Sequence, residues 1–305
     1  MRVAVYYAIV TGRNDGNPLY VFRSLKRRQE KGLLEVDHLA PYESASHYGT
    51  YDLSIWPDWG EDGLTGLIPY SLIDCPKPSI YWASDTHLGY EYRLNMAKKF
   101  DVTFVAQKKA VEDFKRDGVE AIWLPHAFEP EAYHDLTRLD PDTNKPIPFE
   151  FASKEFDVSF VGHVSSTNRE DFLDTMFREF PNFYFGQKQF QDAARIYGKS
   201  KIVLNISMKD DLNMRCFEVI GSKACLLTDR VHGMEDMGFI DGETCVLYST
   251  IDEAIEKTRY YLDHDDEREK IAERGFKLAM ERHTIDHRVS KILEYGKKLL
   301  EPVCA

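Results

Sequence analysis

Arg215 and Glu218 stand three positions apart near the start of an otherwise apolar stretch, DDLNMRCFEVIGSKACLLTD, at residues 210–229. On a helix this spacing places both charges on one face, where a plain ion pair would contribute only about 0.2–0.5 kcal/mol. If a helix starts near Asn213, its first N–H groups and Arg215 together form a binding site for an anion. Glu218, one turn further, could accept hydrogen bonds from the two hydroxyls of a ribose. We therefore expect a nucleotide diphosphate here, with the plain ion pair as the alternative.

Two further loops, each following an expected strand, offer groups suited to phosphates. In IVTGRNDGNP, Gly12 allows a close approach of the backbone to an anion, although an ordinary turn is the alternative. In VSFVGHVSSTNRE, Gly162 and His163 end a strand and are followed by hydroxyl residues and Arg169. This composition suits a diphosphate. The alternative is a solvated loop that carries Arg169 on its surface.

Asp85 and His87 follow an apolar stretch in YWASDTHLG. A carboxylate and an imidazole two residues apart at the end of a strand could orient a hydroxyl group or take its proton. We count both residues as catalytic candidates, together with Arg215. The alternative is that Asp85 caps the next helix while His87 is merely half-buried.

No metal site is expected. DPD at 140–142 and DHD at 263–265 match a metal-binding DxD pattern, but one lies in a polar connection and the other at a helix end. His283 and His287 are four residues apart, as metal ligands often are, yet no third ligand is suggested nearby. We expect these two histidines on the surface face of a helix.

The elements that must position these residues are strands alternating with helices. Most of the strands are continuous apolar stretches without polar alternation, as expected for parallel strands covered on both faces. NPLYVFRSLKRRQEKG predicts a helix with Asn17 as its N-cap, Pro18 at its first position and Gly32 at its end. The expected strands are 3–8, 53–56, 79–83, 102–106, 121–124, 158–161, 182–185, 202–206, 224–227 and 245–247.

The alternation predicts an α/β protein with two Rossmann-like parallel-sheet domains that face each other across a cleft. Residues 136–157 interrupt the series with three prolines and many polar residues, and we interpret them as the connection. The domains are then 1–145, on the acceptor side, and 146–285, which binds the nucleotide. An amphipathic helix at 286–305 is expected to pack back on the first domain.

Composition restricts the partners and the compartment. The formal net charge of -12 disfavours nucleic acid and anionic membranes as main partners. The start of the chain lacks the features of a signal peptide, and no apolar stretch is long enough to span a bilayer. Five scattered cysteines without a CxxC pair fit reduced thiols, so we expect a cytoplasmic protein without a transmembrane segment.

Two long segments also resemble a known family. NMRCFEVIGSKACLLTD, followed by GFIDGETCVLYSTIDEAIEKTRYYLDHDDEREKIAERG, is similar to the C-terminal domain of group 1 glycosyltransferases, and closest to their CgeB-like (spore maturation) branch. DTHLGYEYRLNMAKKFDVTFVAQKKAVEDFKRDGVEAIWLPHAFEPEAY is similar to the N-terminal domain of the same branch. By this resemblance Glu218 matches the second glutamate of the E-x7-E motif, which holds the donor ribose. Asp210 stands where the first glutamate would fall, so the grip on the sugar is expected to differ.

The resemblance implies a GT-B fold and a glycosyltransferase that moves a sugar from a nucleotide-diphosphate sugar, such as a UDP-linked one, to an unidentified acceptor. The acceptor is a glycan, a protein or a small molecule. It also implies a retaining, metal-independent hexosyl transfer that needs no cofactor besides the donor. The alternatives are a sugar-nucleotide epimerase of the same fold and a non-catalytic protein that binds nucleotide sugars.

Overall fold

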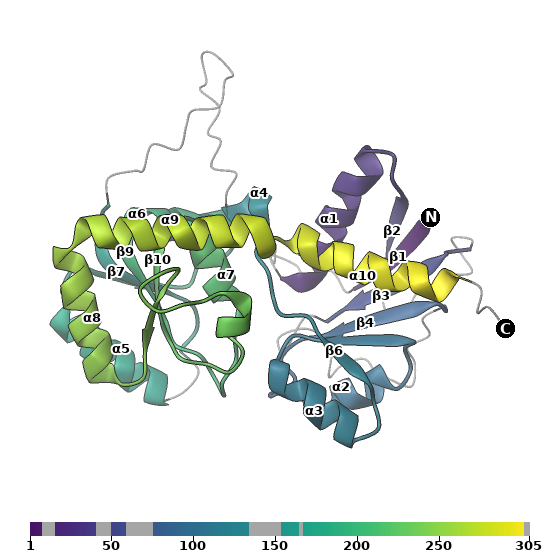
Figure 1. Ribbon diagram of the computed structural model, residues 1–305, viewed down its shortest axis with the longest axis horizontal. Helices are drawn as coiled ribbons and strands as arrows, with labels where there is room; N and C mark the ends of the chain where they lie inside the picture. Colours follow the sequence, from purple (N-terminus) through teal and green to yellow (C-terminus); the bar gives the residue numbers. More distant parts are fainter. Residues whose placement is uncertain (8–15, 41–49, 59–75, 134–153, 165–166, 302–305) are drawn as a thin grey trace, which may run out of the picture. The chain divides into compact units, whose positions relative to one another are not determined.

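The computed structural model describes residues 1–7, 16–40, 50–58, 76–133, 154–164 and 167–301 of the chain. They form two compact units, shown in Figure 1: unit 1 takes residues 1–126 and 285–305, and unit 2 takes residues 127–284. The division falls after residue 126 and not after 145, because Phe128 already pairs with Thr284 and lies against Gly221, both in unit 2. Most of the expected connection, 136–157, lies outside the described residues.

Unit 1 is built on a six-stranded parallel sheet with the order β2-β1-β3-β4-β5-β6. The sequence analysis missed β2, an edge strand with the sequence EVDHL, because its charged and polar residues hide the apolar pattern. It nevertheless pairs with β1 in parallel, with Val3 opposite Val36. The strands are β1 (Arg2–Tyr6), β2 (Glu35–Leu39), β3 (Leu53–Pro57), β4 (Ser79–Ala83), β5 (Val102–Val105) and β6 (Ala121–Trp123).

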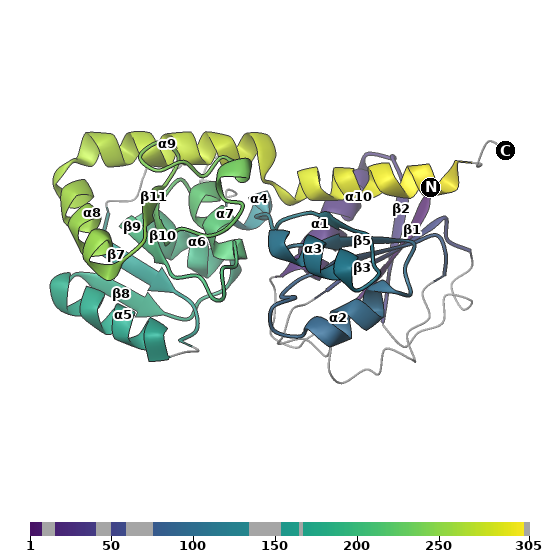
Figure 2. The same cartoon turned by 60° about the horizontal axis from the view of Figure 1, so that its bottom comes forward.

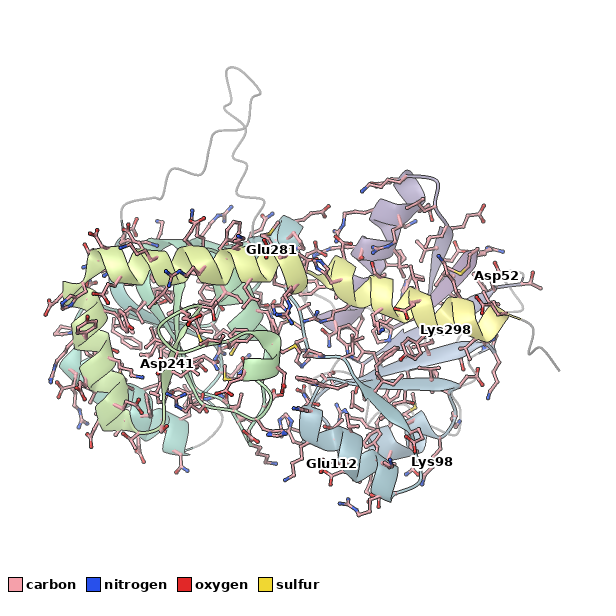
Figure 3. All side chains as sticks on the ribbon, viewed as in Figure 1. Asp52, Lys98, Glu112, Asp241, Glu281 and Lys298 are labelled. Carbon is pink, nitrogen blue, oxygen red and sulfur yellow. The ribbon has the colours of Figure 1, made fainter. Side chains whose placement is uncertain are left out.

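Four helices cover the two faces of this sheet. α1 (Asn17–Glu30) and α10 (Ile285–Leu300) pack side by side on one face, and α2 (Tyr90–Ala97) and α3 (Lys108–Arg116) lie on the other (Figures 1 and 2). Helix α10 is the amphipathic helix near the end of the chain, and it belongs to unit 1. Charged side chains such as Lys98, Glu112 and Lys298 are exposed on this unit (Figure 3).

The start of α1 differs from the prediction. Its N-cap is Gly16, in a positive-φ conformation (φ 105°) that favours glycine, and Asn17 is the first helical residue. The side chain of Asn17 does not cap the helix, and it points instead to His126. Pro18 is therefore the second helical residue, one position later than predicted.

Unit 2 contains a five-stranded parallel sheet with the order β11-β10-β9-β7-β8. Helices α5 and α8 cover one face, and α6 and α7 cover the other, while α9 packs against α7 and β10. The strands are β7 (Phe156–Val161), β8 (Phe183–Gly186), β9 (Ser200–Asn205), β10 (Cys225–Asp229) and β11 (Val246–Tyr248). The helices are α4 (Pro130–Tyr133), α5 (Thr167–Glu179), α6 (Phe190–Lys199), α7 (Met214–Gly221), η4 (Glu235–Met237), α8 (Ile251–Asp263) and α9 (Asp265–Arg282).

All ten predicted strands are present, and their ends shift by at most a few residues. Both sheets are parallel throughout, so the carboxyl ends of the strands in each unit meet at one edge. Among the described helices, none combines the length and the apolar character needed to cross a bilayer.

Candidate functional site

Asn205 is the central residue of the candidate site in unit 2. It ends β9, the middle strand of the sheet, and its side chain is fully buried. Its Oδ1 accepts hydrogen bonds from Nη1 of Arg215 (2.8 Å) and Nδ2 of Asn213 (3.1 Å). Its Nδ2 donates to Oγ1 of Thr228 at 2.9 Å, at the end of β10. The amide therefore joins the ends of two strands to the start of helix α7.

Helix α7 begins directly after Asn213, which is its N-cap in an extended conformation. The side chain of Asn213 makes no capping hydrogen bond and is turned towards Asn205 instead. The first turn of α7 thus has no side-chain cap and contains no acidic residue. Such a helix start attracts an anion through its N–H groups and its dipole.

Arg215 lies on this first turn and is half-buried. Its guanidinium carbon is 4.5 Å from the centroid of the Phe160 ring, so a cation–π contact holds the guanidinium over this ring. The guanidinium also reaches Gly162, where a Cβ atom would lie only 2.0 Å from Nη2. Gly162 follows strand β7 directly, and only the absence of a side chain there allows Arg215 this position.

Arg169, at the start of α5, is nearly fully buried. It donates from Nη1 to the carbonyl oxygen of His163 (2.9 Å) and from Nη2 to that of Ile206 (2.5 Å). Burial, and then the neighbouring charge of Arg215, lower the pKa of Arg169 to about 10. Arg169 is therefore charged at neutral pH. Arg169 holds two loops together, and Arg215 lies beside it with some of its surface exposed.

Glu218, one turn into α7, is 8% exposed. Burial, and next the charge of Glu218, raise the pKa of Tyr197 in helix α6, while the neighbouring Arg215 lowers it. The carboxylate of Glu218 and the guanidinium of Arg215 thus both lie near the Tyr197 phenol. The first two turns of α7 thus carry a positive and a negative group near the same phenol.

Asp210 differs from the glutamate expected at a sugar-binding position in two ways. Its side chain is shorter, and its backbone has a left-handed conformation. It is exposed and has a positive φ of 60°. Its Oδ1 accepts a hydrogen bond from the backbone N–H of His232 at 2.8 Å. The carboxylate of Asp210 therefore ties the loop before α7 to the loop after β10.

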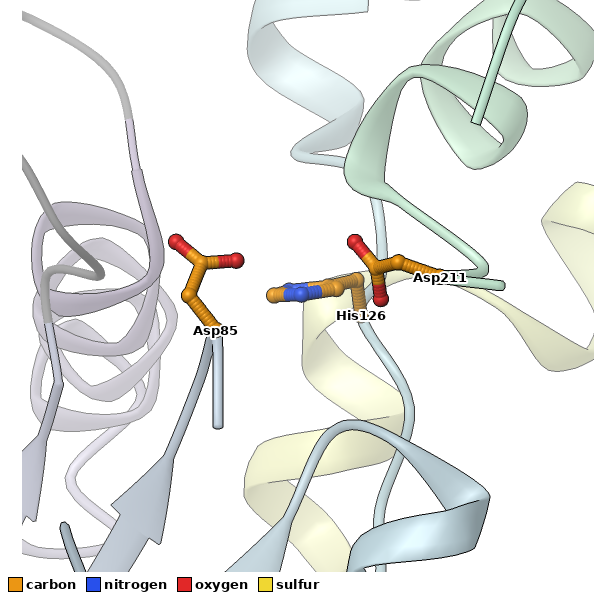
Figure 4. Close-up of side chains that lie close together, drawn as sticks. All are labelled: Asp85, His126 and Asp211. Carbon is orange, nitrogen blue, oxygen red and sulfur yellow. The ribbon is translucent and has the colours of Figure 1, made fainter. Parts of the chain in front are cut away.

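The other candidate residues lie in unit 1. Asp85 and His87 follow β4, and Asp85 has a positive φ of 48°. The alternative role of Asp85 as a helix cap is wrong, since α2 begins at Tyr90 and its N-cap is Gly89. Figure 4 shows the carboxylate of Asp85 facing the ring of His126, a residue that follows β6.

The structure brings together most of the residues named from the sequence. Gly162, Arg169, Asn213, Arg215 and Glu218 lie around the carboxyl ends of β7 and β9. His163 is exposed and contributes its backbone carbonyl. Gly12 lies outside the described residues. The roles assigned to these residues stay predictions.

Sequence reasoning missed Asn205, Phe160, Tyr197 and His126. Asn205 ends strand β9, and Phe160 is the residue before the end of strand β7. This position at the end of a strand was the signal that the sequence offered for both. The prediction that His283 lies on the surface of a helix is wrong. It is 1% exposed, and its Nε2 lies 2.7 Å from the carbonyl oxygen of Met237.

Comparisons with known proteins agree with this architecture. The family model described as Glycosyl transferase-like matches residues 151–294, which contain the whole unit 2 site. No curated protein sequence matches the chain.

Solved structures match almost the entire chain. Sucrose-phosphate synthase from Thermosynechococcus elongatus has a TM-score of 0.65 at 12% identity, covering 98% of this chain and 99% of that one. The HepE protein of Anabaena, solved with UDP and glucose, has a TM-score of 0.63 at 12% identity, covering 98% and 100%. An α-glucosyltransferase, solved with UDP and a 13-mer DNA containing an HMU base, has a TM-score of 0.65 at 8% identity, covering 97% and 99%.

These matches define the fold. Two parallel sheets of six and five strands with flanking helices are the GT-B fold of glycosyltransferases, so the predicted fold is confirmed. The Glycosyl transferase-like family model adds a similarity over residues 151–294, which are less than half of the chain. The CgeB-like branch suggested by the sequence stays a prediction.

Proposed function

We propose that this protein is a glycosyltransferase that moves a hexose from a nucleotide-diphosphate sugar to a hydroxyl-bearing acceptor. The observation that carries the proposal is the position of Arg215. Its guanidinium stands between the uncapped start of α7 and the side-chain-free Gly162, above the ring of Phe160. This arrangement offers one diphosphate a cation, the N–H groups of a helix start and, at Gly162, a backbone without a side chain.

The proposed chemistry stabilises the leaving group. The bond between the sugar C1 and the diphosphate oxygen breaks, and its electron pair leaves with the nucleoside diphosphate. The acceptor oxygen bonds to C1, and its proton passes to the departing diphosphate. Arg215, with Arg169 beside it, strengthens its contact as the charge on the diphosphate grows, which is the general route by which fixed charges accelerate such steps.

Glu218 is the proposed partner of the nucleoside. A carboxylate one turn along α7 can accept hydrogen bonds from both ribose hydroxyls, while Arg215 holds the diphosphate on the first turn. UDP is the first nucleotide to test, because HepE and the α-glucosyltransferase were solved with UDP. The net charge of -12 disfavours DNA as the acceptor of this protein.

The transfer is proposed to need no metal ion and to retain the configuration at C1. Arg215, Arg169 and the start of α7 together supply the positive charge that a divalent cation would otherwise provide. Retention rests on the resemblance to group 1 enzymes. It is tested by determining the anomeric configuration of the product by NMR.

A thermal-shift screen of nucleotide sugars tests the donor. A donor at ~100 times its Kd should stabilise the protein by about 2.7 kcal/mol. The screen is followed by incubation of the best donor with and without candidate acceptors. Slow release of nucleoside diphosphate without an acceptor supports a transferase. A second nucleotide sugar without such release indicates an epimerase, and binding without any turnover indicates a binding protein.

A further inference from the structure

Three polar side chains meet at the carboxyl edge of the sheet in unit 1, outside the proposed donor site. Asn17 opens α1 after strand β1, Asp85 follows β4, and His126 follows β6. A ring nitrogen of His126 lies 3.2 Å from Nδ2 of Asn17. A carboxylate oxygen of Asp85 lies within 4.8 Å of a ring nitrogen of His126, and Figure 4 shows the carboxylate and the ring facing each other.

His126 is held as a neutral imidazole. It is only 5% exposed, and burial lowers its pKa to about 4. The charges of Arg288 and His87 lower this pKa further, and the Asp85 carboxylate opposes them. Nδ1 of the ring lies 3.2 Å from Nδ2 and 3.4 Å from Oδ1 of the Asn17 amide, so this contact fits either tautomer. With Nδ2 as the donor to Nδ1, the ring proton is on Nε2, which is the tautomer that a contact from Nε2 to Asp85 requires.

The backbone around His126 is fixed from helix α10. Arg288 is 6% exposed, and its Nε donates to the carbonyl oxygen of Pro125 at 2.8 Å. Its Nη2 donates to the carbonyl oxygen of His126 at 2.9 Å. The side chain of Asn17 and the guanidinium of Arg288 thus hold the histidine at its ring and at its backbone.

The segment around Asp85 is also held. Its backbone has a positive φ of 48°, a left-handed conformation that aspartate adopts more readily than most residues other than glycine. The next residue, Thr86, is buried, and both its N–H and its hydroxyl donate to Oε1 of Gln107, at 3.1 and 2.9 Å. Asp85 itself is only half-buried.

We propose that His126 is a positioning residue for Asp85, and that Asn17, His126 and Asp85 act as one unit that presents the carboxylate to a hydroxyl group of the acceptor. The proposal rests on the proposed glycosyl transfer and adds the acceptor-side residues to it. Asp85 accepts the hydrogen bond of the substrate hydroxyl. His126 keeps the carboxylate in place with a neutral N–H group whose direction Asn17 determines.

The kinetic test compares Asp85→Asn, His126→Leu, His126→Gln and the double variant Asp85→Asn/His126→Leu. Losing a hydrogen bond to a charged group predicts a fall in kcat/KM for the acceptor of about 10- to 150-fold for Asp85→Asn. His126→Leu should lower it by roughly 10-fold, and His126→Gln, which keeps an N–H donor, should recover part of that loss. If the residues act as one unit, the double variant should be little worse than Asp85→Asn alone.

Two readouts separate positioning from a general loss of structure. The Kd for the nucleoside diphosphate should stay unchanged in every variant, because that site is built from unit 2. The matched control is His38→Gln. His38 is another unit 1 histidine, with Nε2 2.8 Å from the carbonyl oxygen of Tyr7, and its replacement should leave the acceptor kinetics unchanged. Additive losses, or an equal loss in His38→Gln, would overturn the proposal.

An NMR measurement decides the positioning contact without any catalysis. With ¹⁵N-labelled histidine at pH 7, the His126 ring should be neutral and carry its proton on Nε2. Asp85→Asn should shift the Nε2 signal, and Asn17→Ala should mix the tautomers. A proton on Nδ1, or a ring signal that does not change in Asp85→Asn, would contradict the proposal even if the enzyme is active. If no nucleotide sugar is turned over, the role towards a substrate fails with the proposed function, while the NMR result still decides the positioning.

Discussion

The guanidinium of Arg215 occupies the space in which a side chain on Gly162 would begin. An ideal Cβ on Gly162 would lie 2.0 Å from Nη2 and 3.0 Å from the guanidinium carbon of Arg215. The clashing atoms belong to the far end of a flexible side chain, so Arg215 can move, while the φ of 155° at Gly162 adds backbone strain to any substitution there. Gly162→Ala should therefore displace the guanidinium from the diphosphate site, and lower donor affinity by about 10-fold or more. Isothermal titration with UDP measures the effect.

The control for this prediction is the double variant Gly162→Ala/Arg215→Ala. If Gly162→Ala acts by displacing Arg215, the double variant should bind UDP no more weakly than Arg215→Ala alone, because the two changes remove the same contact. Two independent, additive losses would show that Gly162 serves the site in another way, for example through its own backbone.

Arg215→Ala and Glu218→Gln should have different kinetic effects. Removing Arg215 deletes a charge-assisted contact that strengthens in the transition state, so kcat and donor affinity should both fall, with affinity down by about 10- to 150-fold. Glu218→Gln should act mainly on donor affinity, because a ribose is held similarly before and during reaction. It should also discriminate less between ribose and 2′-deoxyribose donors. Steady-state kinetics with both donor types measure the difference.

The plain ion-pair interpretation predicts another outcome for these residues. Both single variants would lose stability, and a charge-swapped double variant, Arg215→Glu/Glu218→Arg, would regain it without any effect on donor binding. Thermal unfolding of the three variants distinguishes the two interpretations.

The alternation of apolar stretches was sufficient to predict both parallel sheets, because strands buried on two faces are continuously apolar. The polar edge strand β2 was not found, since only two of its five residues, Val36 and Leu39, are buried. Arg215 and Glu218 were named from the sequence because charge is conspicuous in an apolar stretch. Asn205 was not found, because a single amide at the end of a strand looks like any turn residue until its partners are known.

Long-range contacts explain the remaining differences. Asn17 was expected to cap its own helix, but its amide is taken by His126, which is 109 positions away in the chain. The boundary between the two units lies earlier in the chain than predicted because Phe128 packs on Gly221, and no local sequence pattern predicts this contact. A sequence pattern shows which residues can do chemistry, whereas only the fold decides which of them share an environment.

Removal of divalent metals should leave the activity intact. The proposed diphosphate site has the guanidinium groups of Arg169 and Arg215, and the start of an eight-residue helix that has no side-chain cap. We expect transfer in excess EDTA at the rate seen with Mg²⁺, measured as nucleoside diphosphate released. Complete loss of turnover in EDTA, restored by Mg²⁺ or Mn²⁺, would contradict this prediction and require a metal site.

The stability of unit 1 should depend on pH through His126. Its pKa is about 4 in the folded protein, against an ordinary value near 6.5 in the unfolded chain, so the folded state binds fewer protons over this range. The stabilisation is fully present above about pH 6.5 and is lost as the pH falls towards 4, by about 2 to 3 kcal/mol at pH 4.5. His126→Gln removes the titrating group. As the pH falls from 7 to 4.5, the variant should therefore gain this amount of stability relative to the wild type.

Urea unfolding followed by tryptophan fluorescence reports on unit 1, because all four tryptophans lie within residues 56–123. A difference that stays constant over this pH range would show that His126 titrates normally, and would contradict the buried neutral imidazole.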